Sequence, residues 1–377
     1  MESVASRLAA AQRFGAILFC VGFLVVGVTL FLAPSHAFPS YLMGFLFWMG
    51  LTLGCFPVLM IYHLVGGIWA VPIRKFLEAG ISTLPVMAVL LVPLLFGFGY
   101  LYRWIHPVDL RTAEVLERKE IYLNMPAWLI RTALFFCVWG AQAFLLLRWS
   151  RRQLESSDPR PTLALRKISA PGLIVFGLTT SFAVVDWVMS LEPDWYSSIF
   201  PLIIIMGQIL SALALSIVLA RTLLFGADEA TPDQLNQLGD LLLTFVMLWA
   251  YMTISQIIII YAGNLPNEIT WYLHRMRGGW LSLSWVVALF AFGVPFFLLL
   301  FRHLKRAPTW LSGIAGGLLV MHAVCVFWYV APSFRSSISF DWLDPFAFIG
   351  VGGAWVLVFS RQLSHNLRLS TISGQSA

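Results

Sequence analysis

The sequence predicts an all-α integral membrane protein with ten transmembrane helices. Hydrophobic residues make up 59% of the 377 residues and charged residues only 11%, whereas soluble globular chains carry about 25% charged residues. Ten apolar segments approach or exceed the roughly 20 residues that a helix needs to cross a bilayer. Helix is expected in each of them, because lipid offers no partner for backbone N–H and C=O groups.

The apolar segments follow one another along the chain with short polar connections, so we expect one polytopic membrane domain over residues 1–377. The segments are predicted at 12–33, 41–68, 81–104, 126–148, 170–190, 199–224, 239–263, 279–301, 309–331 and 344–363. Four prolines lie within or near the starts of segments and predict kinks: Pro57, Pro85, Pro201 and Pro295. The first segment exceeds the apolar region of about 7–15 residues in a cleaved signal peptide, which favours an uncleaved helix.

Lysine and arginine are distributed unevenly between the two sides of the membrane. An even number of spans puts both termini on one side, and sixteen Lys and Arg residues flank the spans there. The opposite loops hold seven, which are Arg103, Arg111, Arg118, Lys119, Arg275, Arg277 and Arg335. The positive-inside bias therefore predicts cytoplasmic termini. It also accounts for the net charge of +6, and no basic block is long enough to predict nucleic-acid binding.

No pattern of catalytic or metal-binding residues is found. Cys20, Cys55, Cys137 and Cys325 all lie in apolar runs, and none has the spacing of a metal, iron–sulfur or covalent haem motif. The histidines form no HExxH motif, and no phosphate loop or nucleophile–base pair is present. The sequence therefore predicts no metal site, no catalytic residue and no cofactor carried by this chain itself.

Three acids interrupt the stretch VVDWVMSLEPDWYSSIF, residues 184–200. An ionisable residue inside a transmembrane segment is costly and marks a functional hypothesis. Asp186 lies about one turn before the outer end of the fifth span, and Arg131 begins the fourth span at similar depth. Asp186 is either an interfacial acid hydrated at the membrane surface or the partner of Arg131. Such a pair is either a structural clamp or part of a proton exit route. Glu192 and Asp194 are predicted in a short outer loop, hydrated at the membrane surface.

Histidines mark two further places in the apolar segments. His63 is predicted near the inner end of the second span, with Glu78 on the same side, as a proton-uptake cluster or as a packing histidine. His322 lies near the middle of the ninth span. The two histidines differ in predicted depth by five or six residues, about 8 Å, which is awkward for axial ligands of one haem.

Hydroxyl and amide groups occur in the sixth and seventh spans, among them Gln208, Ser211, Tyr251 and Gln256. They either bond between helices and to backbone carbonyls or form a hydrated relay. The complete candidate proton path comprises His63, Glu78, Arg131, Asp186, Glu192, Tyr251, Gln256 and His322.

Three stretches together carry a family resemblance: YHLVGGIWAVPIRKFLEA (62–79), SLEPDWYSSIF (190–200) and NLPNEITWYLHRMRGGW (264–280). Between residues 12 and 365 the chain resembles the NrfD and polysulfide-reductase membrane-anchor superfamily. It looks there like the ActF-like subunits of bacterial alternative complex III, which are paralogues of ActC. The resemblance implies two four-helix bundles, residues 41–190 (helices 2–5) and 199–331 (helices 6–9). Helices 1 (12–33) and 10 (344–363) lie outside them.

The resemblance also implies a function. The chain would be a non-catalytic, cofactor-free subunit of a respiratory or photosynthetic complex in the bacterial inner membrane. Such a complex oxidises quinol and passes electrons to cytochrome c or another acceptor. The implied partners are an ActC-like quinol-binding paralogue, a multihaem cytochrome c subunit, an iron–sulfur subunit, other membrane subunits and lipid. Haem c and iron–sulfur clusters would sit on those partners, and this chain would support the complex and offer a proton path.

Two other functions remain open from the sequence. The chain could hold quinol itself near the outer end of helices 2–5, where Asp186 would accept a proton. It could also be a stand-alone secondary transporter, although the interrupted helix pairs typical of that class are not evident in the sequence.

Overall fold

The computed structural model describes residues 2–105, 117, 119–155, 158–224, 230–266 and 268–375. Helix accounts for 84% of the chain, no strand occurs among the described residues, and ten helices are long and apolar enough to span a membrane. The prediction of an all-α protein with ten spans is thus confirmed. Arg111 and Arg118, which entered the predicted charge distribution, lie outside the described residues.

All ten predicted segments correspond to helical spans. The first five are α1 (Glu2–Leu32), α2 (Pro34–Val65), α3 (Arg74–Ile81) with α4 (Leu84–Phe96), α7 (Met125–Glu155) and α8 (Arg160–Trp187). The second five are α9 (Phe200–Leu219), α10 (Pro232–Gly263), α12 (Trp280–Val287) with α13 (Val294–Leu300), α15 (Pro308–Val330) and α16 (Leu343–Gln375). Short helices α5 (Phe98–Leu101), α11 (Thr270–His274) and α14 (Arg302–Arg306) lie in the connections.

The third span is shifted from its predicted place. It was expected at 81–104 but runs over Arg74–Phe96, because the amphipathic helix α3 precedes the apolar part and the chain turns at Gly97. Several other helices begin earlier or end later than their apolar segments, since polar turns continue a helix beyond the lipid.

Two spans are interrupted, although interrupted helix pairs are not evident in the sequence. The third is divided at Ser82 and Thr83, and the eighth contains the wide π-helical turn η3 (Ala288–Gly293) between α12 and α13. Pro85 and Pro295 lie in the first turn after each interruption, where the missing proline N–H costs no helical hydrogen bond.

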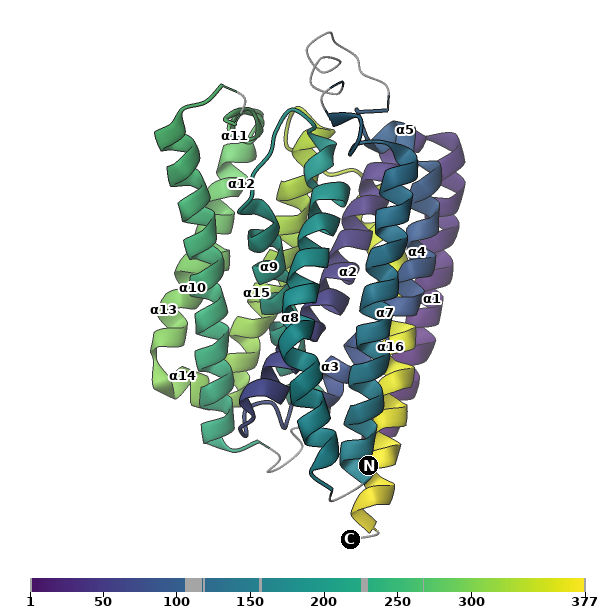
Figure 1. Ribbon diagram of the computed structural model, residues 1–377, viewed down its shortest axis with the longest axis vertical. Helices are drawn as coiled ribbons and strands as arrows, with labels where there is room; N and C mark the ends of the chain where they lie inside the picture. Colours follow the sequence, from purple (N-terminus) through teal and green to yellow (C-terminus); the bar gives the residue numbers. More distant parts are fainter. Residues whose placement is uncertain are drawn as a thin grey trace.

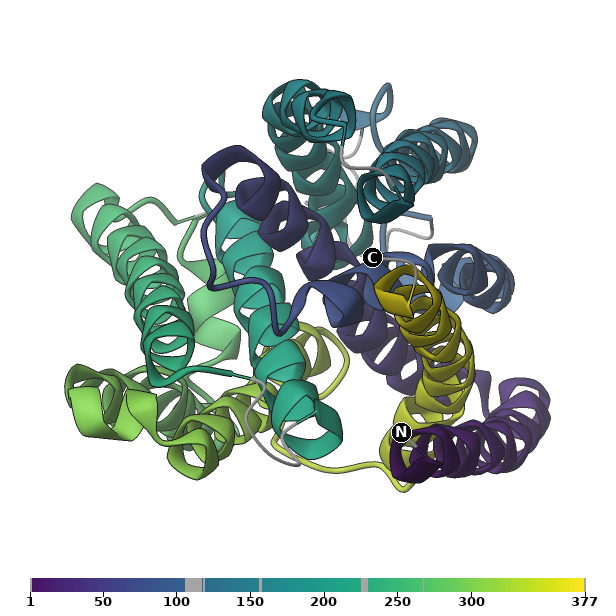
Figure 2. The same ribbon diagram turned by 90° about the horizontal axis from the view of Figure 1, so that it is seen from below.

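We call α2, α3 with α4, α7 and α8 the first helix group and α9, α10, α12 with α13 and α15 the second, and α2 and α8 of the first pack on α9 of the second. Helix α2 packs on α3, α4 and α8, helix α9 packs on α10 and α15, and α2 and α9 pack on each other. Helices α1 and α16 pair along their length outside both groups, as the view from below shows (Figure 2). Glycines allow this pairing, because a Cβ on Gly22 would lie 2.5 Å from Cα of Gly350.

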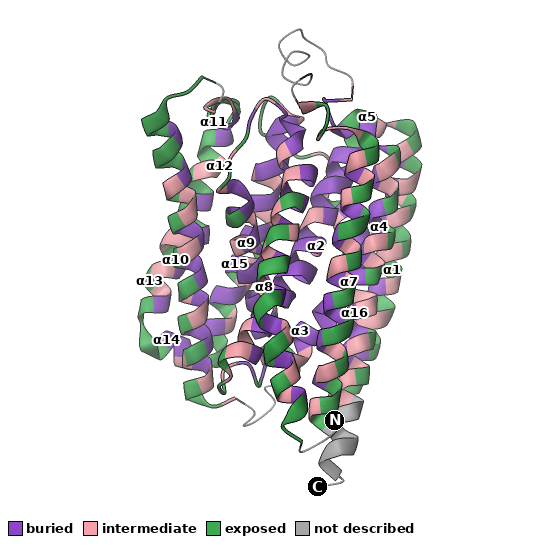
Figure 3. Ribbon diagram, viewed as in Figure 1, coloured by how far each residue is buried: buried purple, intermediate pink, exposed green. Residues whose placement is uncertain are grey.

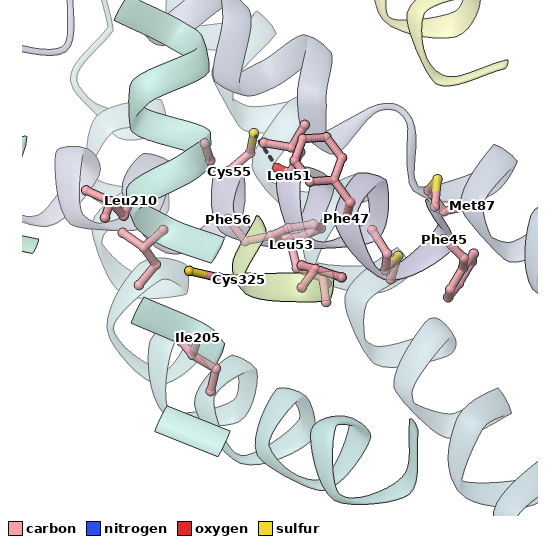
Figure 4. Packing of buried hydrophobic residues seen from close by; sticks show 14 of the residues in the cluster. Phe45, Phe47, Leu51, Leu53, Cys55, Phe56, Met87, Ile205, Leu210 and Cys325 are labelled. Atoms are coloured by element: carbon pink, nitrogen blue, oxygen red, sulfur yellow. Dashed lines mark hydrogen bonds between the residues drawn. The ribbon is translucent and has the colours of Figure 1, made fainter. Parts of the chain in front are cut away.

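Burial separates central from peripheral helices. In the most apolar stretch of each span, 83% of the residues are buried in α2 but only 22% in α1, and exposed residues cover the outward faces of the peripheral helices (Figure 3). Figure 4 shows the packing of the centre, where Phe45, Leu53 and Phe56 of α2 lie among buried side chains that include Leu210 of α9 and Cys325 of α15.

Both termini lie at one end of the molecule (Figure 1). We call it the terminal end, and the opposite end, which carries α5 and α11, the distal end. The arrangement agrees with an even number of spans. It puts Asp186 and Glu192 near the distal end and Glu78 near the terminal end.

Candidate functional site

Asp186 and Arg131 form the predicted ion pair at the distal end. Nε of Arg131 lies 2.8 Å from Oδ2 of Asp186, and Nη2 lies 2.9 Å from Oδ1. The Asp186 side chain is fully buried, and the ring of Tyr122 lies 3.9 Å from the guanidinium carbon. Parallel bidentate bonds of this kind are the strongest geometry for an arginine–carboxylate pair. The pair joins α7 to α8.

Glu192 does not lie in a hydrated loop, so that prediction was wrong. Its side chain is only 7% exposed and contacts residues far away in the sequence. One carboxylate oxygen accepts hydrogen bonds from Nη1 of Arg275 at 3.1 Å and from Oγ of Ser333 at 2.8 Å. The other oxygen lies 3.0 Å from Nδ1 of His274. We call Glu192, His274, Arg275 and Ser333 the distal cluster.

Arg275 is the centre of the distal cluster. Its guanidinium donates to the backbone oxygens of Trp328 (3.2 Å) and Tyr329 (2.7 Å) in the last turn of α15, and it lies 3.5 Å from the ring centre of Trp271. The last carbonyls of a helix have no partner within it, and they carry partial negative charge. An arginine at this point therefore satisfies both the helix end and the buried carboxylate.

The charges of the distal cluster stabilise one another. Burial alone would raise the pKa of Glu192, but the hydrogen bond to His274 and the charge of Arg275 outweigh it and lower the pKa to about 2. Burial lowers the pKa of Arg275 to about 10, against the opposing charge of Glu192. Both groups are consequently ionised at neutral pH, as a buried pair that is well hydrogen-bonded can be.

The terminal end holds a third buried cluster, around Glu78. Oε1 of Glu78 accepts hydrogen bonds from Nε of Arg74 at 2.8 Å and from the hydroxyl of Ser150. Arg74 also donates to Oγ of Ser150 at 2.6 Å and to Oε1 of Gln153 at 2.9 Å. The cluster fastens α3 to the terminal end of α7.

Nε2 of His63 forms no hydrogen bond with the Glu78 cluster, although His63 lies within reach of the charge of Arg74, which belongs to that cluster. The carboxylate of Glu78 is taken by Arg74 and Ser150, and Nε2 of buried His63 has no hydrogen-bond partner among the described residues. His63 is thus buried in the last turn of α2, and its Nε2 is not bonded to Glu78.

His322 lies at a cavity between the two helix groups. The cavity measures about 50 Å³ and is lined by residues of α2, α8, α9, α10, η3 and α15. Three side chains in its wall have a buried polar atom without a partner among the described residues: Nε2 of His322, Oε1 of Gln208 and Oγ1 of Thr180. Tyr329 also lines it, and its backbone oxygen bonds to Arg275. We call this space the central cavity.

The two histidines are much farther apart in depth than the sequence suggested. An added Cβ on Gly50 would lie 3.2 Å from Nε2 of His322, so His322 is level with Gly50 of α2. Thirteen residues of the same helix, about 20 Å, separate Gly50 from His63. One haem cannot bridge that separation.

Tyr251 and Gln256 differ in burial, although both belong to α10. The side chain of Tyr251 is 66% exposed, on the surface that lipid would cover, so placing it in the polar interior was wrong. Gln256 is 2% exposed and forms a hydrogen bond with the hydroxyl of Tyr272, close to the distal cluster.

A second cavity of about 250 Å³ lies at the distal end beside α8. Its wall includes Lys119, Tyr122, Ser190 and Tyr196. Lys119 donates to the backbone oxygen of Pro193 at 2.7 Å, and Tyr122 connects this cavity with the Asp186–Arg131 pair. We call it the distal cavity.

Comparisons with known proteins do not place the chain in a family. Neither a scan against protein-family models nor a search of curated proteins gives a match. In the part of the chain that the structure describes, no group of three or more His, Cys, Asp or Glu residues could hold a metal ion.

The sequence analysis missed the partners of Glu192. His274 and Arg275 lie within the stretch 264–280 that carries the family resemblance, yet Arg275 was used only as a topological charge. Nothing in the sequence distinguishes Ser333 and Thr180 as functional residues, because a single hydroxyl in an apolar segment is common and usually bonds to a carbonyl of its own helix.

Proposed function

We propose that this chain is a membrane subunit of a complex that oxidises quinol and passes electrons to cytochrome c or another acceptor. One observation carries the proposal: two stretches on which the family resemblance rests form a single structure at the distal end. Glu192 of the stretch 190–200 binds His274 and Arg275 of the stretch 264–280. Nε1 of Trp195 donates to the backbone oxygen of Glu268 at 3.0 Å, and its ring stacks on Trp271.

In this proposal the distal end faces outward from the bacterial inner membrane and the termini are cytoplasmic. The multihaem cytochrome c and iron–sulfur subunits would dock on the distal end, and an ActC-like paralogue and other membrane subunits would pack laterally. Those partners would carry haem c and iron–sulfur clusters. This chain supplies the scaffold, since its buried charges are used between its own helices.

The chain also offers groups for proton transfer. Glu78 and His63 lie toward the terminal end, His322 and Gln208 at the central cavity, and the distal cluster near the opposite end. A route outward through the second helix group would run from the central cavity past Tyr329 and Arg275 to Glu192 and His274. The His274 side chain is 47% exposed, which gives the route contact with water.

Purification of the tagged chain from its native membrane in mild detergent tests the proposal. We expect co-purification of a protein with c-type haem absorbance and a protein with iron–sulfur clusters. A variant with Tyr196→Ala, which changes a side chain that is 57% exposed at the distal end, should lose these partners while retaining its own fold, whereas Tyr251→Phe, on the lipid-facing surface, should keep them. Recovery of the wild-type chain without any haem protein would contradict the proposal.

A quinol site on this chain is the second candidate, and the distal cavity supports it. Its volume of about 250 Å³ exceeds the roughly 150 Å³ that admits a benzene ring in a protein core, and it adjoins the Asp186–Arg131 pair through Tyr122. A quinone-analogue inhibitor should then bind more weakly to Asp186→Asn and Arg131→Ala variants. Unchanged inhibition in both variants would exclude this site.

Secondary transport is the least supported candidate, because the central cavity of about 50 Å³ is too small for most organic substrates. Substrate-dependent uptake by the purified chain in liposomes would be needed to support it.

A further inference from the structure

The central cavity combines polar groups from three helices with an otherwise apolar wall. His322 belongs to α15, Gln208 to α9 and Thr180 to α8, and each is less than one-tenth exposed. The remaining wall consists mainly of apolar side chains, such as Leu53, Met321 and Cys325. The three polar atoms therefore have few alternatives to a partner within the cavity.

A partner is expected on energetic grounds. Nε2 of His322, Oε1 of Gln208 and Oγ1 of Thr180 have no hydrogen-bond partner among the described residues. Each buried polar atom without a partner destabilises the folded state, because it has lost its hydrogen bonds to water. Three such atoms around one space are rare in native proteins, where buried polar groups are bonded to protein or to ordered water.

The volume of the central cavity limits which molecules can bond to these three polar atoms. A water molecule requires about 10–15 Å³ of such volume, and an apolar cavity of about 150 Å³ takes up benzene. The central cavity of about 50 Å³ has room for three or four water molecules but not for an aromatic ring. A quinone headgroup is thus excluded from it in this conformation.

Glycines keep the space open beside the polar groups. An added Cβ on Gly50 would lie 3.2 Å from Nε2 of His322 and 3.3 Å from Cγ of Gln208, and one on Gly207 would lie 3.7 Å from Nδ1 of His322. Larger residues at these positions would occupy the volume next to the unpartnered atoms. Gly207 therefore helps to form the cavity, and Gly50 leaves room beside Nε2 of His322.

We infer that the central cavity binds a cluster of about three ordered water molecules, held by His322, Gln208 and Thr180. Water can donate to Oε1 of Gln208 and can either donate to or accept from His322 and Thr180, so one species satisfies all three atoms. Such waters make two to four hydrogen bonds each and are part of the structure. This site does not depend on the proposed complex, because every group that forms it belongs to this chain.

X-ray radiolytic footprinting of the purified chain tests the site, because radiolysis of bound water oxidises neighbouring sulfur atoms. Met49, Met321 and Cys325 line the cavity, and Met60 and Met87 do not. Met49 is 1% exposed and so matches Met60 and Met87, each 0% exposed, whereas Met321 is 8% exposed. We expect Met49 to be oxidised several-fold faster than Met60 and Met87. Equal rates for these three residues would overturn the inference.

Two variants make the test specific. The triple variant Thr180→Val, Gln208→Leu and His322→Leu removes the polar atoms, so oxidation of Met49 should then fall to the rate of Met60, and oxidation of Met321 should fall as well. Gly50→Ala keeps all three polar groups but narrows the space, so it should lower the rate partially. If the triple variant does not fold, Gly50→Ala decides, and an unchanged Met49 rate in a folded variant of either kind would overturn the inference.

Discussion

Asp186 and Glu192, six residues apart in the sequence, bind arginines in opposite helix groups. Asp186 pairs with Arg131 of α7, and Glu192 pairs with Arg275, which precedes α12. The short segment between the two acids therefore connects both groups at the distal end. Its two buried carboxylates act as anchors on either side of the boundary between helices 2–5 and helices 6–9.

The Asp186–Arg131 pair is expected to contribute strongly to stability. Arg131→Ala leaves a fully buried carboxylate without its cation, and removing one member of a buried pair costs about 3–5 kcal/mol. Replacing both residues by leucine should recover most of this loss, since apolar residues of similar volume often substitute for a buried pair. Unfolding of the single and double variants in detergent provides the measurement.

The same variants separate a clamp from a proton route. If the pair only joins α7 to α8, the double leucine variant regains both stability and quinol-driven proton release by the reconstituted complex. If Asp186 carries protons, the double variant regains stability but proton release stays low, as it does in Asp186→Asn.

The stability contributed by Glu192 should depend on pH. Its pKa is about 2 in the folded protein and 4.5 when unperturbed, so the contribution is complete above pH 4.5 and is lost as the pH falls toward 2. The shift corresponds to about 3 kcal/mol. In Glu192→Gln this part of the acid sensitivity should be absent, as measured by unfolding in detergent across that range. Asp233→Asn, which changes an exposed acid at the terminal end, should retain the wild-type pH dependence.

The fold class and the Asp186–Arg131 pair could be predicted from the sequence because both depend on local information. Apolar segment length determines a span, and Asp186 and Arg131 lie at similar depth in consecutive spans that must run antiparallel. Their pairing thus required only the order and direction of the helices. Of the four prolines expected to kink spans, Pro85 and Pro295 follow interruptions, whereas Pro57 lies inside the continuous helix α2 and Pro201 in the first turn of α9.

The distal cluster could not be predicted in that way. Glu192 and Arg275 are 83 residues apart, and neither lies in a transmembrane segment, so apolar length and helix direction give no constraint on their distance. The prediction for Tyr251 was wrong for a different reason. Lipid accepts apolar and aromatic side chains as readily as the core does, so a tyrosine does not mark the buried face of a span. Which face of α10 is buried depends on α9 and α13, which pack against it.

Opposite effects are expected for the two polar residues of α10. Gln256→Leu removes the partner of the Tyr272 hydroxyl in a buried position, which should cost about 1–3 kcal/mol. Tyr251→Phe changes only an exposed hydroxyl and should alter stability by less than about 0.5 kcal/mol. Thermal unfolding of both variants in the same detergent checks this difference. A larger loss in Tyr251→Phe would show that its exposed surface is covered by another part of the protein.

Contact between α2 and α9 depends on Gly54. An added Cβ there would lie 2.0 Å from the backbone oxygen of Gln208, which cannot move without shifting α9. Gly54→Ala should therefore destabilise the protein by about 1–3 kcal/mol through overpacking, and the shift of Gln208 should disturb the central cavity.

Gly140→Ala is the matched control, because an added Cβ on Gly140 of α7 meets nothing within 4 Å. That change should stabilise the helix by about 0.5–1 kcal/mol. Unfolding of the two variants under one set of conditions should give changes of opposite sign. Equal effects of the two substitutions would contradict the close approach of α2 and α9, on which the arrangement of the two helix groups depends.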